Sequence, residues 1–262
     1  MQNILDLERF PLDRPDSREY QELVARCQQD LLSNGLFNLE GLVKLSALEE
    51  MVGSILPVME SDSFTHSRNH NIYFRKSIPE IPEDHKALLK FTTVNHTICA
   101  DQIPDSLLMN IYEWPPLIRF LERVMQKPSL YTMDDPLARV NVMAYYAGEA
   151  LNWHFDRSEF TTTLLLQAPE SGGIFQYQTD LRSDSDPNYD GVGRFVTSDY
   201  SSAENLFLSA GTLNVFKGKN TAHRVTPVEG GLERLIAVFS YYETRNVLFS
   251  EEERVGFYGR AG

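Results

Sequence analysis

The sequence predicts an α+β protein, mainly β, in which a double-sheet jelly roll follows a mostly helical N-terminal region. Apolar residues recur every three or four positions in much of the first half of the chain, as they do on the buried faces of helices. After about residue 137, eight short segments rich in Val, Ile, Thr, Tyr and Phe are separated by Gly, Pro or Asn. Such a run of strands is typical of a β-sandwich or barrel. We expect one structural domain, with a helical region at 1–134 packed on a jelly-roll core at 135–262.

The elements of the N-terminal region follow in order. The apolar spacing predicts a helix over 17–34, which Asp16 or Ser17 can cap and Asn34-Gly35 can end. The segment GLFNLEGLV (35–43) predicts a strand, and SALEEMVGSILPVME (46–60) predicts a second helix. SRNHNIYFRK (67–76) alternates enough for a short strand. DSLLMNIYEWPPLIRFLERVMQK (105–127) predicts two helices broken at Pro115-Pro116, because proline cannot continue a helix interior.

The core strands are expected in eight segments. They are ARVNVMAYY (138–146), ALNWHFD (150–156), TTTLLLQAP (161–169), GGIFQYQ (172–178), NLFLSAG (205–211), TLNVFKG (212–218), HRVTPV (223–228) and RLIAVFSYYE (234–243). The segment 179–204 between two of them is polar and long for a connection inside a barrel. Long loops of this kind are often lids or binding loops, although a solvated insertion fits the composition equally well.

Composition limits the partners of the protein. The 262 residues carry a net charge of −13, which disfavours nucleic acid because phosphate binding needs a basic face. The chain has neither an apolar run of membrane-spanning length nor the apolar region of a secretory signal near Met1. The two cysteines, Cys27 and Cys99, are too few for a disulfide framework. We expect a cytoplasmic protein that binds no membrane, and the sequence leaves its oligomeric state open.

The motif with chemical content is His154-Phe155-Asp156. Residues two apart in a strand project from the same face, so His154 and Asp156 point the same way. His223 is the other histidine in the β-rich half. Two histidines and one carboxylate suit a non-haem Fe(II) centre with open positions. A surface hairpin that merely carries His and Asp is the alternative, since this pair alone is weak evidence.

A basic residue downstream of His223 is a further candidate for the site. Arg234 lies eleven residues after His223 and opens an apolar strand. A charge buried there would need an anionic partner, and the planar guanidinium matches a carboxylate. The alternative is a strand-end arginine that pairs with Glu229 or Glu233 at the rim.

The segments NVMAYYAGEALNWHFD, TTTLLLQAPESGGIFQY and SAGTLNVFKGKNTAHRVTPVEGGLERLIAVFSYYE together resemble the Fe(II)/2-oxoglutarate-dependent oxygenases of the double-stranded β-helix fold. The resemblance covers about residues 135–260 and is greatest to the branch of prolyl-4-hydroxylase-like enzymes, free-amino-acid hydroxylases and radical halogenases. The matching positions are Tyr145, Gly148, His154, Asp156, Gly172, Gly173, Phe175, Gly211, Phe216, His223, Val225, Pro227, Val228, Gly230 and Arg234.

The resemblance implies a cofactor set and roles for these residues. His154, Asp156 and His223 would bind Fe(II), Arg234 would pair with the distal carboxylate of 2-oxoglutarate, and Tyr145 would assist. The co-substrate and O₂ would be converted to succinate and CO₂ while a C–H bond of the substrate is hydroxylated. Halogenases of the superfamily have Gly or Ala where this chain has Asp156, so hydroxylation is expected. Desaturation and cyclisation remain alternatives.

The same resemblance implies a small substrate, a free amino acid above all. Candidate contacts are Arg157, His70, Arg75, Asn152 and Tyr258. A cation at 157 facing the substrate would repel an ammonium group and favour a neutral or acidic side chain, unless it pairs outward with Glu159 or Asp180. Trp153 should face away from the ligands and pack. The rivals are a prolyl-hydroxylase-like enzyme acting on a polypeptide, a zinc or cupin-type isomerase or hydrolase, and a non-catalytic jelly-roll binding module.

Overall fold

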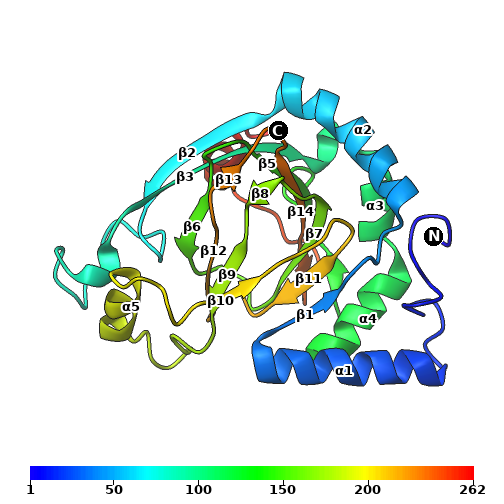
Figure 1. The fold of residues 1–262 in the computed structure, drawn as a ribbon, viewed down its shortest axis with the longest axis horizontal. Helices are drawn as coiled ribbons and strands as arrows, with labels where there is room; N and C mark the ends of the chain where they lie inside the picture. The colour runs from blue at the N-terminus through cyan, green and yellow to red at the C-terminus, as the bar shows by residue number, and fades with distance from the viewer.

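The computed structural model describes residues 1–262 and has the predicted jelly roll at its centre (Figure 1). A seven-stranded antiparallel sheet, in the order β1-β11-β7-β14-β5-β3-β2, faces a four-stranded antiparallel sheet, β10-β9-β12-β6. The strands of the core are β5 (Val140–Tyr145), β6 (Leu151–His154), β7 (Thr161–Gln167), β8 (Ser171–Gly172), β9 (Phe175–Gln178), β10 (Glu204–Leu206), β11 (Leu213–Phe216), β12 (Ala222–Val225), β13 (Val228–Glu229), β14 (Arg234–Phe239) and β15 (Tyr241–Tyr242).

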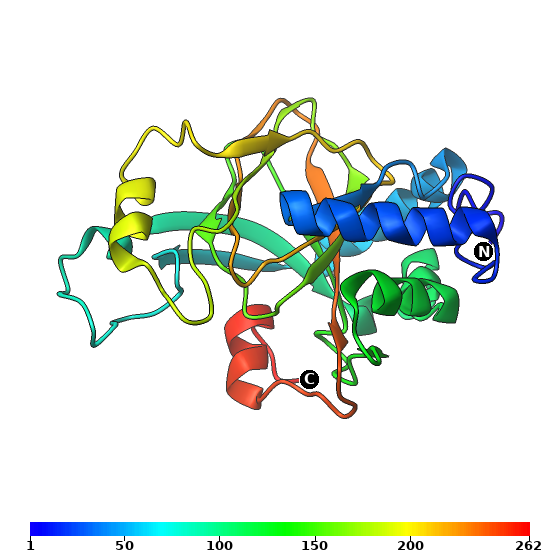
Figure 2. The ribbon, with the colours of Figure 1, turned by 90° about the horizontal axis from the view of Figure 1, so that it is seen from below.

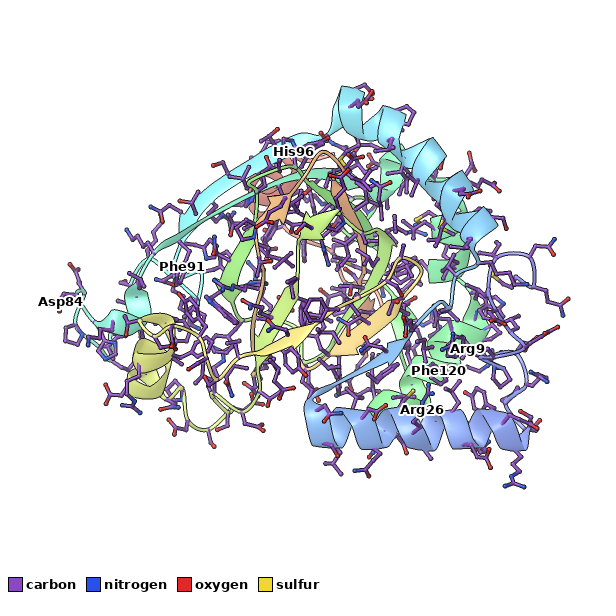
Figure 3. The ribbon with its side chains drawn as sticks, in the orientation of Figure 1. Arg9, Arg26, Asp84, Phe91, His96 and Phe120 are labelled. Carbon is purple, nitrogen blue, oxygen red and sulfur yellow. The ribbon has the colours of Figure 1, made fainter.

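Four helices cover the outer face of the larger sheet at one end of the molecule. They are α1 (Arg18–Asn34), α2 (Leu45–Asp62), α3 (Leu107–Tyr112) and α4 (Pro115–Met125) (Figure 1). The capping residues predicted for the first helix are in place: the Ser17 hydroxyl accepts a hydrogen bond from the Tyr20 amide, and Gly35 ends α1 with a φ of 72°. Phe120 of α4, labelled in Figure 3, contacts the rings of Tyr20 and Phe37 edge to face.

The N-terminal region also contributes strands β1 (Leu36–Leu39), β2 (Phe64–His70) and β3 (Phe91–Cys99) to the larger sheet. The sequence pattern predicted β1 and part of β2 but not β3. β3 extends the sheet beyond β5, with His96 opposite Ala144. Residue 134 therefore marks a change of composition within one sheet, because strands from both sides of it pair directly.

Side chains of the larger sheet point alternately to its two faces, one of which packs in the core while the other faces the site. Outward-facing residues such as Val142, Leu164 and Ala237 join the large apolar cluster beneath α1–α4. Their neighbours, including Asn141 and Thr163, face the space between the two sheets. Because the period of a strand is two, one sheet carries an apolar core on one face and a polar lining on the other.

The segment 179–204 contains a helix that the sequence analysis did not predict, α5 (Tyr189–Val196), and it lies at the opposite end of the molecule from α1 (Figure 2). The Asn188 side chain caps it, and it packs on the short helix η1 (Lys86–Leu88), where His85 Nε2 lies 3.2 Å from Asp190 Oδ1. Trp153 is fully buried against Phe195 of α5, as expected for a residue facing away from the ligands.

The C-terminal helix α6 (Glu251–Tyr258), red in Figure 2, lies against β2 and β3. Asp135 is completely buried and accepts hydrogen bonds from the Phe249 amide and from Arg254 Nε at 2.9 and 2.8 Å. These bonds fix the start of α6 to the core. None of the helices combines the length and the apolarity that crossing a bilayer requires.

Candidate metal centre and its cavity

The three predicted metal ligands meet between the sheets. His154 at the end of β6 lies directly opposite His223 of β12, and Asp156 follows β6 by two residues. Nε2 of His154 is 3.4 Å from one carboxylate oxygen of Asp156, and Nε2 of His223 is 3.4 Å from the other. The three ligand atoms all lie within 4.8 Å of one another. Antiparallel pairing of two strands thus brings together residues that are far apart in the sequence.

Hydrogen bonds orient each of these side chains. Nδ1 of His154 lies 2.8 Å from the Asn152 carbonyl, and Nδ1 of His223 lies 2.9 Å from the Thr221 carbonyl. When Nδ1 carries the proton and donates it to these carbonyls, the Nε2 lone pair is free for a metal. The Thr161 hydroxyl donates to Oδ2 of Asp156. These partners point the three donor atoms at one position.

The electrostatics of the cluster favour the ligating protonation states. Burial acts to raise the pKa of Asp156, but the adjacent His223 and His154 outweigh it and hold that pKa well below its usual range. Burial lowers the pKa of His154, assisted by His223. A carboxylate and a neutral imidazole at neutral pH are what a divalent metal needs, and this set of donors fits Fe(II).

Arg234 lies in the same cavity without an anionic partner. Its side chain is only 2% exposed, and its Nη1 atom has no hydrogen-bond partner. Neither Glu229 nor Glu233 pairs with it: Glu229 accepts from Ser171, and Glu233 accepts from Gln167. Burial lowers its pKa to about 10, which leaves the guanidinium charged at neutral pH. An unpaired buried charge is costly, so this position fits an anionic ligand.

The surroundings of Arg234 are polar and unsatisfied. Tyr145 lies opposite it across the β5–β14 pair and is 1% exposed. The carbonyl oxygens of the Asn95 and Asn214 side chains are buried in the same cavity and have no partner. Gly173, with a φ of 58°, leaves room for the Arg234 side chain, since a Cβ there would approach its Cδ to 3.1 Å. Neither asparagine was among the site residues predicted from the sequence, because the only signal of each is an amide within a strand.

The cavity has a volume of about 820 Å³ and contains both the metal cluster and Arg234. This size is within the range of pockets that enclose small-molecule ligands. Aromatic rings line much of its wall, including Phe74 and Phe257. Of the five substrate contacts expected from the sequence, Arg75, Arg157 and Tyr258 line the cavity.

The other two expected contacts do not line the cavity. Both ring nitrogens of His70 have partners, the Asn71 carbonyl at 2.9 Å and the Thr93 hydroxyl at 2.8 Å. The Asn152 side chain donates to the Thr92 carbonyl. Because β3 passes beside β2 and β6, it supplies the Thr93 hydroxyl to His70 and the Thr92 carbonyl to Asn152. Both side chains are therefore held within the sheet and do not face the cavity.

Arg157 also differs from its expected role. Its Nη1 lies 2.6 Å from Oε1 of Glu253 in α6, and the side chain is 70% exposed. A paired and exposed arginine exerts little repulsion on a substrate ammonium group. The expected preference for a neutral or acidic side chain therefore loses its basis, although the partner is Glu253 rather than Glu159 or Asp180. Tyr258 donates its hydroxyl to Asn141 at 2.9 Å, so that hydroxyl is already engaged.

Comparison with known proteins supports the assignment of the fold. A family model described as HalD, Halogenase D, matches residues 20–253. No curated protein matches the chain. The non-heme alpha ketoglutarate dependent epimerase SnoN from nogalamycin biosynthesis is 12% identical, with a TM-score of 0.59 and coverage of 85% of this chain and 83% of its own.

Two further structures have the same architecture. HygX from Streptomyces hygroscopicus, solved with nickel, 2-oxoglutarate and hygromycin B, is 13% identical with a TM-score of 0.55, and 82% of this chain and 86% of that one are covered. A Pseudomonas putida prolyl-4-hydroxylase is 14% identical with a TM-score of 0.51, with coverage of 82% and 97%. The fold is that of the 2-oxoglutarate/Fe(II) oxygenases, as the sequence resemblance implied.

Proposed function

The chain belongs to the Halogenase D family, and from that premise we propose that it is an Fe(II)/2-oxoglutarate-dependent oxygenase that hydroxylates an unactivated C–H bond of a free amino acid. The observation that carries the proposal is the pairing of two features in one cavity. Three convergent metal donors lie at one position, and an unpartnered guanidinium, Arg234, is buried at another. A binding module without catalysis has no need for both.

The residues present fit the cofactors. His154, Asp156 and His223 would hold Fe(II) on one face and leave positions for other ligands. Arg234 would bind the distal carboxylate of 2-oxoglutarate, and the Tyr145 ring beside it would complete that end of the site. When bound, iron and 2-oxoglutarate supply the oxidising power, with O₂ consumed and succinate and CO₂ released.

The protein's own contribution is orientation and exclusion of water. The backbone carbonyls of Asn152 and Thr221 keep both imidazole rings turned toward the metal position. Apolar rings such as Phe216, 4.7 Å from the His223 ring, shield the reacting region. A site held in fixed geometry confines oxidation to the substrate bond nearest the metal.

Asp156 supports hydroxylation over halogenation within a family named for halogenases. A halide on the metal would need the position that the carboxylate occupies, and the carboxylate charge opposes a second anion. The Thr161 hydroxyl and the Gly218 carbonyl both bind Asp156, through its side chain and its amide respectively. Desaturation or cyclisation would begin with the same oxidation and is distinguished by the product.

A succinate-coupled screen over free amino acids, with mass spectrometry of each product, tests the proposal. Gain of one oxygen atom supports hydroxylation, whereas loss of two hydrogens or gain of a halogen replaces that part of the proposal. Proline-containing peptides run in parallel test the rival polypeptide substrate. Purified protein with Fe(II) that develops no visible absorption band on addition of 2-oxoglutarate would contradict the whole assignment.

A further inference from the structure

The cavity of this acidic protein is lined by cations. The chain has a net charge of −13, yet five basic side chains besides Arg234 border the cavity. They are Arg68, Arg75, Arg157, Arg182 and Lys219. Basic residues gathered around a cavity attract anions and raise their local concentration. The question is which of them is free to bind one.

Three of the five are already engaged. Arg157 pairs with Glu253 at 2.6 Å, and Lys219 pairs with Asp184 at 2.8 Å. Arg182 donates from Nε to the Lys219 carbonyl at 3.0 Å, and its guanidinium lies 3.8 Å from the centre of the Phe155 ring. Arg75 is exposed to solvent, where an ion pair contributes little free energy.

Arg68 of β2 is different. It is half-buried, and it forms no salt bridge with a carboxylate. The only hydrogen bond of its side chain to the protein is a long one, 3.4 Å, from Nη2 to the Gly256 carbonyl. The guanidinium carbon lies 5.8 Å from the centre of the Phe74 ring and 5.6 Å from that of Phe257. The two rings position the cation while leaving most of its N–H groups without partners.

Arg68 lies close to the metal centre. The Phe74 ring lies 5.6 Å from the ring of His154, so a single aromatic side chain separates Arg68 from a metal ligand. Phe74 has a φ of 54°, which is unfavourable for a residue with a side chain, and the Asn71 side chain holds this turn by accepting from the Tyr73 and Arg75 amides. The backbone is thus constrained to place this ring between Arg68 and the site.

We propose that Arg68 binds the carboxylate of the amino-acid substrate, so that the enzyme selects free acids over their amides. The proposal rests on the proposed function, since it assigns Arg234 to the co-substrate. The two arginines are distinct: Arg234 is completely buried at the start of β14, whereas Arg68 lies at the half-exposed end beside α6. A guanidinium with free N–H groups along its edge binds a planar carboxylate through two parallel bonds.

Binding to the Ni(II)/2-oxoglutarate-loaded protein tests the proposal without turnover. Isothermal titration with each proteinogenic amino acid and its carboxamide should show binding by at least one free acid and much weaker binding by the matching amide. Arg68→Gln should weaken binding of that acid by about tenfold or more, because hydrogen bonds between charged groups are lost. Arg68→Lys, which keeps the charge but not the planar fork, should give an intermediate loss.

Arg245→Gln is the matched control. Arg245 is an exposed arginine over the Tyr131 ring, 4.1 Å from its centre, and it does not line the cavity. This variant should bind the acid as the unaltered protein does. The affinity for 2-oxoglutarate and the melting temperature should stay constant in all three variants, which separates lost recognition from misfolding.

Three results would overturn the role of Arg68. They are acid and carboxamide binding alike, Arg68→Gln retaining full affinity for the acid, and no free acid binding at all. Each can occur while 2-oxoglutarate still binds, so each is distinguishable from failure of the proposed function. If the proposed function itself is wrong, the unaltered Ni(II) protein will not bind 2-oxoglutarate, and both proposals are then refuted.

Discussion

Replacing Arg234 by methionine should have opposite effects on ligand binding and on stability. The guanidinium is 2% exposed, has no anionic partner and stays charged at neutral pH. Each hydrogen bond between charged groups contributes about 1.5–3 kcal/mol. Loss of two such bonds to the distal carboxylate should weaken 2-oxoglutarate binding by about 3–6 kcal/mol, roughly 10²- to 10⁴-fold.

The same substitution should stabilise the ligand-free protein. Methionine fills a similar volume without the charge, and exchanging buried charges for apolar groups is neutral or stabilising by about 1–4 kcal/mol. In a chain of this size, each kcal/mol raises the melting temperature by about 2–4 °C. A residue that served only to support the fold would show the reverse, because its removal would lower the melting temperature.

Calorimetric titration of 2-oxoglutarate and thermal unfolding with and without the ligand measure both effects. At about one hundred times its Kd, 2-oxoglutarate should stabilise the unaltered protein by about 2.7 kcal/mol and Arg234→Met by no more than about 0.4 kcal/mol at the same concentration. Arg234→Lys, which keeps the charge, separates loss of charge from loss of the planar fork. Undiminished affinity in Arg234→Met would refute the assigned role.

Four further predictions follow from the same geometry. His223→Ala should abolish Fe(II) binding and succinate formation, as measured by metal analysis after gel filtration and by a coupled assay; retained iron would contradict its role as a ligand. Asp156→Gly should remove the carboxylate and strongly lower hydroxylation, and mass spectrometry in the presence of chloride would detect any chlorinated product; unchanged hydroxylation would remove the argument from Asp156. Thr161→Val, which removes the hydrogen bond to Asp156, should weaken metal affinity by about 10- to 100-fold, and an unchanged Kd would show that this bond is dispensable. Burial lowers the pKa of His70 to about 4, below its unfolded value of about 6.5. Between these two values the unfolded state binds more protons, so the free energy of unfolding should fall as the pH drops from about 6.5 to 4. His70→Gln should flatten this part of the curve of stability against pH measured by urea unfolding, and an unaltered slope would contradict the reasoning.

The parts of the site that the sequence predicts are those set by short spacing. His154 and Asp156 are two residues apart on one strand, so their common face follows from the pleat alone. His223 and Arg234 could be added because they sit at the starts of recognisable strands. The mostly β core was predictable because its strands are recognisable as short local segments.

The parts that could not be predicted depend on register between distant strands. Asn95 faces the cavity because β3 pairs with β5, and the sequence analysis did not identify β3 at all. The candidate role of Arg68 depends on its contacts with the rings of Phe74 and Phe257, which are far apart in the chain. Whether Arg157 pairs inward or outward was decided by α6, a helix whose position no local pattern specifies.

The residues around Asp156 are fitted to a carboxylate at that position. A Cβ on Gly218 would overlap Oδ2 of Asp156, so the glycine leaves the space that the carboxylate fills. The Gly218 carbonyl accepts the Asp156 amide at 3.0 Å, and Thr161 donates its hydroxyl to the same Oδ2 atom. A glycine at 156 would leave the Thr161 hydroxyl without this acceptor and open a gap beside Gly218. In this member of a family named for halogenases, the neighbours of residue 156 therefore support retention of the carboxylate, on which the proposed hydroxylation rests.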